Sequence, residues 1–240
     1  TGTITNDDAA TVSLAGNVSQ AENLTPQVFT VNLSNPVDVA VTVLFNTSNG
    51  TASTADNDYT GIVNQTVTFA AGTTTAQTVN TTILNDNKVE ANEVYDVAIG
   101  TLNASGRNVS LGTSSGTGTI TNDDAATVTL TPSGGISQNE GNTGTTLYQF
   151  FATLNNPVQG SFTVNYTSDD GTATAGTDYI NNDGIILFSG AAGQSQPISI
   201  LANGDFFVEA DETFSVALNS INGAPAGVSL AGSPQTGTIL

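Results

Sequence analysis

The stretch TGTITNDDAATVSL at residues 1–14 returns at residues 117–130 as TGTITNDDAATVTL, and this repetition decides how the chain is organised. Thirteen of the fourteen positions are identical, at an offset of 116 residues. The two copies share further motifs in the same order: Asn35-Pro36 with Asn156-Pro157, Asp58-Tyr59 with Asp178-Tyr179, Val89-Glu90-Ala91 with Val208-Glu209-Ala210, and Val109-Ser110-Leu111 with Val228-Ser229-Leu230. We therefore expect two tandem copies of one domain.

The register of the repeat predicts the domain boundaries. We expect repeat one over residues 9–124 and repeat two over residues 125–240, with residues 1–8 as the closing strand of a preceding repeat. Repeat two lacks the acidic segment that ends repeat one. Such a chain is expected to be cut from a longer array, in which neighbouring repeats are its partners and any targeting signal lies outside the numbered residues.

Each repeat is predicted to consist of strands alone. Short runs rich in Val, Thr, Ile and Phe alternate apolar and polar residues, and Gly, Asn, Asp and Pro separate them. Seven short strands in little more than 110 residues fit an immunoglobulin-like β-sandwich. The fold class is therefore all-β, as two tandem seven-stranded sandwiches. The strands expected in repeat one are 10–14, 27–34, 38–46, 64–70, 76–84, 94–102 and 109–121.

Composition narrows the function classes. The chain carries 21 acidic and two basic side chains, a net charge of −19, so we expect no nucleic-acid partner. No segment is apolar enough for insertion into a membrane. Cys and His are absent, which removes the usual zinc sites and the common catalytic triads. Paired acids also occur in glycosidases, but the loop rim of a small sandwich offers no evident sugar cleft, and we expect no enzyme.

The acidic side chains fall on loops that a sandwich brings to one end. In repeat one they follow the first, third, fifth and seventh expected strands, and odd-numbered connections leave a sandwich at the same end. A solvated loop position is the simpler reading for each acid alone. The candidate carboxylates are Glu22, Asp58, Asp86, Glu90, Asp123 and Asp124 in repeat one, and Glu140, Asp178, Asp205 and Glu209 in repeat two.

Carboxylates gathered at one end of a sandwich repel one another unless a cation lies between them. Two of them about 4 Å apart repel by about 4 kcal/mol at an effective dielectric of 20. Calcium takes six to eight oxygen ligands in irregular geometry, whereas magnesium demands a strict octahedron. We therefore expect Ca²⁺ as the bound ion. Glu93, Asp211 and Glu212 are left open, as ligands, as caps of a strand entry, or as charges on the rim.

Three motifs together resemble the Calx-beta family: DDGTATAGTDY at 169–179, LANGDFFVEADETFSVAL at 201–218 and GTGTITNDD at 116–124. The resemblance covers nearly the whole chain in two copies. It implies a seven-stranded sandwich with a calcium cluster at one end. Members of the family occur in the cytosolic regulatory region of sodium–calcium exchangers and in long arrays on bacterial surface proteins.

The resemblance also implies which positions are ligands. The family's early glutamate falls on Glu22 and Glu140, and its aspartate before tyrosine falls on Asp58 and Asp178. Its acidic loop here reads Asn85-Asp86-Asn87 and Asn203-Gly204-Asp205, which carries less charge than the consecutive aspartates of exchanger domains, so we expect fewer or weaker ions. The remaining implied ligands are Glu90 and Glu209, backbone carbonyls of Lys88 and Phe207, and the terminal acids Asp123 and Asp124.

Three functions fit these features. The first is a calcium-stiffened structural repeat of a secreted or cell-surface stalk, fibre or adhesin, because NDD runs directly into AATV and leaves little flexible linker. The second is an adhesive or assembly module that binds a glycan or surface protein, or that polymerises by strand exchange. The third, a cytosolic calcium sensor, fits a tandem array poor in basic residues least well. We expect an extracellular or cell-surface location.

Overall fold

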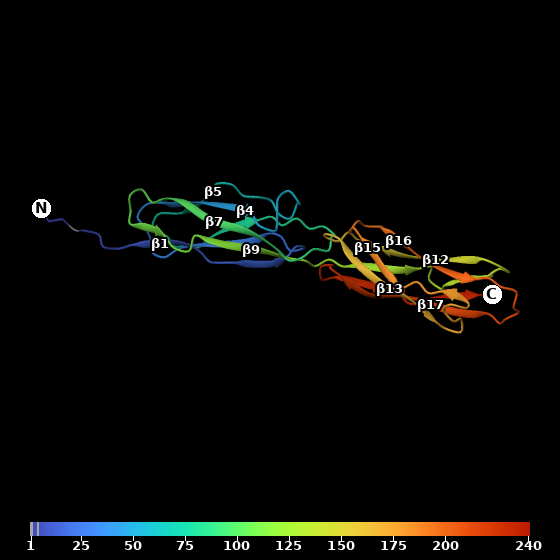
Figure 1. Ribbon diagram of the computed structural model, residues 1–240. Helices are drawn as coiled ribbons and strands as arrows, with labels where there is room; N and C mark the ends of the chain where they lie inside the picture. The colour runs from blue at the N-terminus through green and yellow to red at the C-terminus, as the bar shows by residue number, and fades with distance from the viewer. Residues whose placement is uncertain (1, 4) are drawn as a thin grey trace. The chain divides into compact units, whose positions relative to one another are not determined.

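The structure, a computed structural model, describes residues 2, 3 and 5–240 of the chain (Figure 1). All regular structure in this part of the chain is β-strand, and no described helix is long and apolar enough to cross a membrane. The chain forms two compact units. The first holds the residues up to Asp86 together with Asn92–Asp123, and the second holds Asn87–Ala91 together with Asp124–Leu240. Each unit has its own hydrophobic core.

The first unit is a sandwich of two sheets with the strand orders β6-β3-β1-β8 and β2-β9-β7-β4-β5. Neighbouring strands are antiparallel, except that β1 pairs with β8 and β2 pairs with β9 in parallel. The strands are β1 (Ala10–Leu14), β2 (Val18–Ala21), β3 (Gln27–Leu33), β4 (Val41–Asn49), β5 (Gln65–Phe69), β6 (Gln77–Thr81), β7 (Glu93–Asn103), β8 (Val109–Leu111) and β9 (Ser115–Thr121).

The second unit repeats this topology with the strand orders β14-β16-β12-β10-β18 and β11-β19-β17-β13-β15. Its additional edge strand, β14, corresponds in the first unit to an isolated bridge between Tyr59 and Ile83. The strands are β10 (Ala126–Thr131), β11 (Ile136–Gln138), β12 (Thr145–Leu154), β13 (Phe162–Asp170), β14 (Tyr179–Ile180), β15 (Gly184–Phe188), β16 (Ser195–Asn203), β17 (Glu212–Asn222), β18 (Val228–Ala231) and β19 (Gln235–Ile239).

The two ends of each repeat depart from the predicted strand list. The single strand expected over 109–121 is two strands, β8 and β9, which lie in different sheets, and β2 was not expected at all. Gly112 marks the break. A side chain there would lie 2.3 Å from the Ser13 hydroxyl oxygen, so the backbone passes close against β1 before it crosses to the other sheet. The start of the repeat is thus divided between β1 in one sheet and β2 in the other, and its end is divided between β8 and β9 in the same way.

The expected closing strand over residues 1–8 stays a prediction. Residues 2, 3 and 5–8 carry no strand, whereas Thr1 and Ile4 lie outside the described residues. A strand forms only where neighbouring backbone groups complete its hydrogen bonds. For residues 1–8 the predicted neighbours are strands of a preceding repeat.

Alternating strands bury aromatic side chains between the two sheets of each unit. In β3 every second residue is buried, including Phe29, and Tyr59 stacks on Tyr95 with ring centroids 4.2 Å apart. The second unit places Tyr179 against Phe214 at 4.9 Å in the matching position. Burial of each such side chain contributes about 1.5–3 kcal/mol. The tyrosines follow Asp58 and Asp178 directly, so the core anchors the loops that carry the acidic residues.

Candidate metal centre

The acidic site of the second unit starts from a tight turn before β14. Gly176 adopts φ +95°, a left-handed conformation that glycine takes readily. The turn brings the carboxylate of Asp178 to the Thr174 N–H, which donates a hydrogen bond at 2.7 Å. The carbonyl of Asp178 accepts a hydrogen bond from the Asn203 N–H at 2.8 Å. Backbone groups therefore hold this aspartate in place at the loop end.

Three carboxylates meet at this turn. One carboxylate oxygen from each of Asp178, Glu209 and Glu212 lies within 4.8 Å of the others, and we call these three residues the Asp178 cluster. Glu212 is the first residue of β17, and Glu209 lies on the loop before it. Asp178 and Glu212 are half-buried, whereas Glu209 is exposed. Two loops distant in sequence thus deliver three acids to one small volume.

Two further acids predicted for this site lie beside the cluster. Burial raises the pKa of the Glu140 carboxyl above its ordinary value of 4.5, and the negative charges of Asp205 and Glu209 raise it further. The pKa of Glu212 is also raised, first by burial and then by the charge of Asp178 and a hydrogen bond with it. Asp205 accepts a hydrogen bond from the Phe207 N–H at 2.7 Å, which closes a turn in the loop. The acids therefore repel one another in the absence of a cation.

The first unit has matching acids that are more deeply buried. Glu22, Asp58 and Glu93 are 5%, 8% and 8% exposed. Carboxylate oxygens of Asp58 and Glu93 lie within 4.8 Å of one another, and so do those of Glu22 and Asp86. Asp58 accepts a hydrogen bond from the Ser53 N–H at 2.6 Å, as Asp178 does from the Thr174 N–H, although the turn of the first unit is one residue longer. Burial of charge is unfavourable unless a partner compensates it, and a cation is one partner that can do so.

Three further acids of repeat one were also predicted as ligands. Asp123 is exposed and belongs to no carboxylate group among the described residues, so its part as a ligand stays a prediction. Glu90 and Asp124 lie on segments that their contacts assign to the second unit. On its segment, Glu90 forms an ion pair with the ammonium group of Lys88.

The two predicted backbone ligands stay predictions as well. At Lys88 the structure shows the side-chain ion pair with Glu90, and at Phe207 it shows the N–H bonded to Asp205 and a side chain that is 77% exposed. Neither contact involves the carbonyl oxygen that the family resemblance implies.

Glu93 and Glu212 were not predicted as ligands from the sequence. Both were left open as ligands, caps or rim charges, yet each lies within 4.8 Å of the aspartate that precedes the buried tyrosine of its unit. Their positions in the sequence could have indicated this role. Each stands three residues after the loop glutamate and opens a long strand, β7 or β17. Asp211, also left open, is exposed and belongs to no carboxylate group among the described residues.

The donor set fits calcium. Oxygen ligands 2.3–2.6 Å from one ion lie within about 5 Å of each other, and the oxygens of the Asp178 cluster meet this limit at 4.8 Å. All donors are oxygens because the chain has no His or Cys, so zinc and copper have no preferred ligand here. An irregular set of carboxylates from two loops suits calcium better than the octahedral shell of magnesium. Asp178, Glu209 and Glu212 would hold the ion, with Glu140 and Asp205 at its side.

These features define a class of protein: a pair of β-sandwich modules that each gather carboxylate oxygens from loops and from the start of a long strand. The model of the Calx-beta domain matches residues 6–125 and again residues 136–240. The chain belongs to the Calx-beta family, whose domains are calcium-binding modules that also occur in the regulatory region of Na⁺/Ca²⁺ exchangers. The family resemblance seen in the sequence is confirmed, as is the all-β fold of two tandem sandwiches.

Solved structures of Calx domains are similar to this chain. CBD12 from CALX1.2 is 19% identical, with 95% of this chain and 98% of that chain covered and a TM-score of 0.45. The calcium binding domain CBD12 of CALX1.1 is 17% identical, with the same coverage and TM-score. The apo-form Calx CBD1 domain is 25% identical over 49% of this chain and 97% of that chain, with a TM-score of 0.42. TM-scores below 0.5 add nothing to the family assignment. No curated protein matches the sequence.

Proposed function

We propose that the chain is a calcium-binding structural repeat of a secreted or cell-surface stalk, fibre or adhesin, and not an enzyme. The Asp178 cluster carries this proposal, because three carboxylates within 4.8 Å of each other repel unless a cation lies between them. The first unit supports it with two further carboxylate pairs on matching loops. Ion binding to the folded state alone stabilises that state by mass action.

The structural role rests on the architecture and the composition. Each unit is a sandwich without helices among the described residues, and the NDD motif runs directly into the AATV strand of the next repeat. A net charge of −19 suits a surface exposed to millimolar calcium. The stiffening of repeats by calcium and the location outside the cell belong to the proposal.

Calorimetry with and without calcium tests the function. The melting temperature should rise by several degrees in 10 mM CaCl₂ and fall back with excess EDTA, since a site with a Kd on the order of 10⁻⁴ M contributes about 2.7 kcal/mol at that concentration. Equal magnesium should raise it less. The same melting temperature in calcium and in EDTA would refute the proposal.

A matched pair of variants locates the effect in the first unit. Asp58→Asn removes one charge from the buried pair with Glu93, whereas Asp56→Asn removes the same charge at an exposed position two residues away. Asp58→Asn should reduce the calcium-induced rise, and Asp56→Asn should leave it intact. An equal reduction by both variants would show that general screening, not a site, causes the rise.

An adhesive or assembly module is the second candidate, and one observation favours it. Strand β15 lies at the edge of its sheet and exposes Ile185 and Leu187, at 67% and 59%. An exposed apolar edge is a template for strand addition by a surface protein or another copy. Filament formation that Leu187→Lys abolishes, or specific binding on a glycan array, would support this candidate. A monomer that binds neither partner would exclude it.

A further inference from the structure

A short segment of repeat one completes the core of the second unit. Val89 is fully buried there and forms a parallel bridge with Val158. The Val89 N–H donates to the Pro157 carbonyl at 2.9 Å, and the Gln159 N–H donates to the Val89 carbonyl at 2.8 Å. The Ala91 N–H donates to the Gln159 side-chain oxygen at 3.1 Å. Residues 156–159 thus receive an inserted valine with backbone hydrogen bonds on both of its sides, and we call them a receiving loop.

The repeat carries the same insertion segment a second time, and there it is uncovered. Val208-Glu209-Ala210 matches the triplet that contains Val89, yet Val208 is 100% exposed. Phe206 and Phe207 beside it are each 77% exposed. Residues 206–210, which we call the insertion segment, thus present three adjoining large apolar side chains to solvent. A contiguous exposed apolar patch of this kind marks an interaction site.

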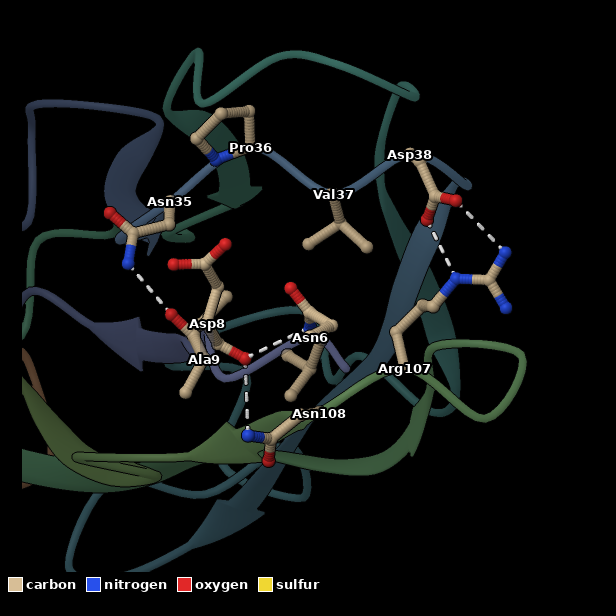
Figure 2. Close-up of a pocket in the computed structure, with 11 residues that line it drawn as sticks. Asn6, Asp8, Ala9, Asn35, Pro36, Val37, Asp38, Arg107 and Asn108 are labelled. Carbon is tan, nitrogen blue, oxygen red and sulfur yellow. Dashed lines mark hydrogen bonds and ion pairs between the residues drawn. The ribbon is translucent and has the colours of Figure 1, made fainter. Parts of the chain in front are cut away.

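The first unit carries a matching receiving loop that is open. Asn35-Pro36-Val37-Asp38 corresponds to the loop that holds Val89, and it lines a pocket of about 450 Å³ (Figure 2). Its frame is built in the same way in both units. The side-chain amide of Asn35 donates to the carbonyl of Ala9 at 2.7 Å, as that of Asn156 donates to Ala125 at 2.9 Å.

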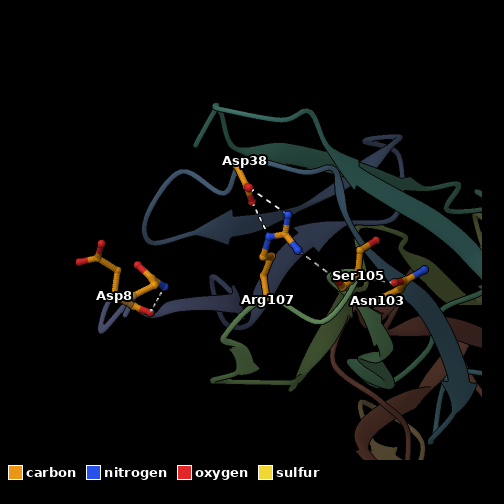
Figure 3. Close-up of polar contacts among 6 residues, drawn as sticks. Asp8, Asp38, Asn103, Ser105 and Arg107 are labelled. Atoms are coloured by element: carbon orange, nitrogen blue, oxygen red, sulfur yellow. Dashed lines mark hydrogen bonds and ion pairs between the residues drawn. The ribbon is translucent and has the colours of Figure 1, made fainter. Parts of the chain in front are cut away.

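One cationic side chain lies at the receiving loop. Arg107, one of only two basic residues in the chain, lines this pocket and donates to Asp38 at 2.7 and 3.0 Å and to the Ser105 carbonyl at 3.3 Å (Figure 3). The insertion segment lies within the acidic run from Asp205 to Glu212. Arg107 is paired with Asp38 and Asp8 also lines the pocket, so replacement of Arg107 by Glu would leave only carboxylates to face the acidic segment.

We propose that the insertion segment of one chain docks into the receiving loop of a second copy, with Val208 bridging Val37 as Val89 bridges Val158. The contact is heterologous, because the second unit of one copy meets the first unit of the next, and such contacts build open chains. One loop in one pocket makes a small interface, so we expect a Kd on the order of 10⁻⁴ M. The proposal rests on the equivalence of the repeats and not on bound calcium.

Sedimentation velocity of the whole chain tests it. Between about 10 µM and 1 mM, the weight-average mass should rise well above the monomer mass of 24.2 kDa, in EDTA as well as in calcium. Val208→Asp places a charge where an apolar side chain would be buried and should weaken association about tenfold or more. Arg107→Glu should do the same from the receiving side. Val63→Asp, at another valine that is 78% exposed, is the matched control and should associate as the unaltered chain does.

Mixing the two variants makes the test independent of folding defects. Val208→Asp keeps its receiving loop, and Arg107→Glu keeps its insertion segment, so an equimolar mixture should form dimers and nothing longer. A chain that stays monomeric at 1 mM would overturn the proposal. Association that survives both variants would overturn it too, as would a mixture of folded variants that gives no dimer. Failure of calcium to alter the melting temperature would leave these outcomes unchanged, so the two proposals fail separately.

Discussion

Replacing Glu212 by Gln should stabilise the second unit without calcium and destabilise it with calcium. Glutamine keeps the size of the side chain and its ability to hydrogen-bond with Asp178, but it removes one charge from the Asp178 cluster. Without an ion that charge repels two neighbours, and with an ion it is a ligand. The effect of a single substitution on the free energy of unfolding is therefore expected to reverse sign.

The geometry sets the magnitude in EDTA. Two unit charges 4.8 Å apart repel by about 3.5 kcal/mol at an effective dielectric of 20 and by about 0.9 kcal/mol in bulk water. Glu209 is exposed, so the lower figure applies to that pair. We expect Glu212→Gln to raise the free energy of unfolding by about 1 kcal/mol, or the melting temperature by about 4 °C.

Linkage sets the magnitude in calcium. A site with a Kd on the order of 10⁻⁴ M contributes about 2.7 kcal/mol at 10 mM calcium, and a tenfold weaker site contributes about 1.4 kcal/mol. Loss of one carboxylate ligand should weaken binding by at least that factor. The variant therefore gains about 1.3 kcal/mol less from calcium than the unaltered chain does, which outweighs its advantage in EDTA.

Differential scanning calorimetry in EDTA and in 10 mM CaCl₂ measures both effects on the same protein. Asp211→Asn is the control, since it removes an equal charge from the neighbouring exposed residue, which lies outside the cluster. That control should shift neither the EDTA value nor the calcium increment by much. A lower melting temperature for Glu212→Gln in EDTA, or an undiminished calcium increment, would refute the geometry assigned to the Asp178 cluster.

Three further predictions follow from the described residues. In EDTA, lowering the pH from 7 toward 4.5 should raise the melting temperature, because the carboxyls of Glu140 and Glu212, whose pKa values are raised in the folded state, bind protons there that the unfolded chain releases. In calcium the same change of pH should lower the melting temperature, because protons displace the ion. If the melting temperature changed with pH in the same way in both solutions, both expectations would be contradicted. Tyr148→Phe removes the one O–H donor that lies 2.7 and 2.8 Å from carbonyl oxygens on β11 and β19, and it should destabilise by about 1–2 kcal/mol in urea titrations. Tyr166→Phe, which removes one bond of 3.3 Å, should cost less, and the reverse order would be contrary evidence. Gly118→Ala places a methyl group against the Tyr95 ring and should destabilise the first unit by about 1–3 kcal/mol. Gly100→Ala meets open space and should be close to neutral. Equal effects of the two substitutions would show that the core rearranges to accept the methyl group.

The sequence was sufficient for most strands and for the two sandwiches, because both depend on period-two alternation and on the repeat. It was insufficient at the ends of each repeat. β2 is only four residues long and half exposed, so it shows no apolar face. The break between β8 and β9 depends on the close approach of Gly112 to β1, and such a contact between segments 100 residues apart leaves no local pattern.

The sequence predicted which residue types form the candidate site, but it predicted less well which individual residues belong to it. Turn chemistry located Asp58 and Asp178 beside the buried tyrosines, whereas Glu93 and Glu212 are strand-opening residues whose part depends on the facing loop. Identical triplets can also differ completely in burial. Val89 and Val208 are followed by the same two residues, yet one is fully buried and the other fully exposed, because burial depends on what lies opposite.

The parallel pairing of β2 with β9 determines how each sandwich would carry a pulling load. Val18 to Ala21 lie in register with Gly118 to Thr121. The chain reaches β2 through β1, which lies in the other sheet, and it leaves the unit at the end of β9. Tension along the chain would pull these two strands past each other, so that all hydrogen bonds between them bear force together and none opens before the rest. The second unit pairs β11 with β19 in the same sense. A tether assembled from such units would resist extension up to an abrupt rupture of individual units, rather than yielding gradually from one end.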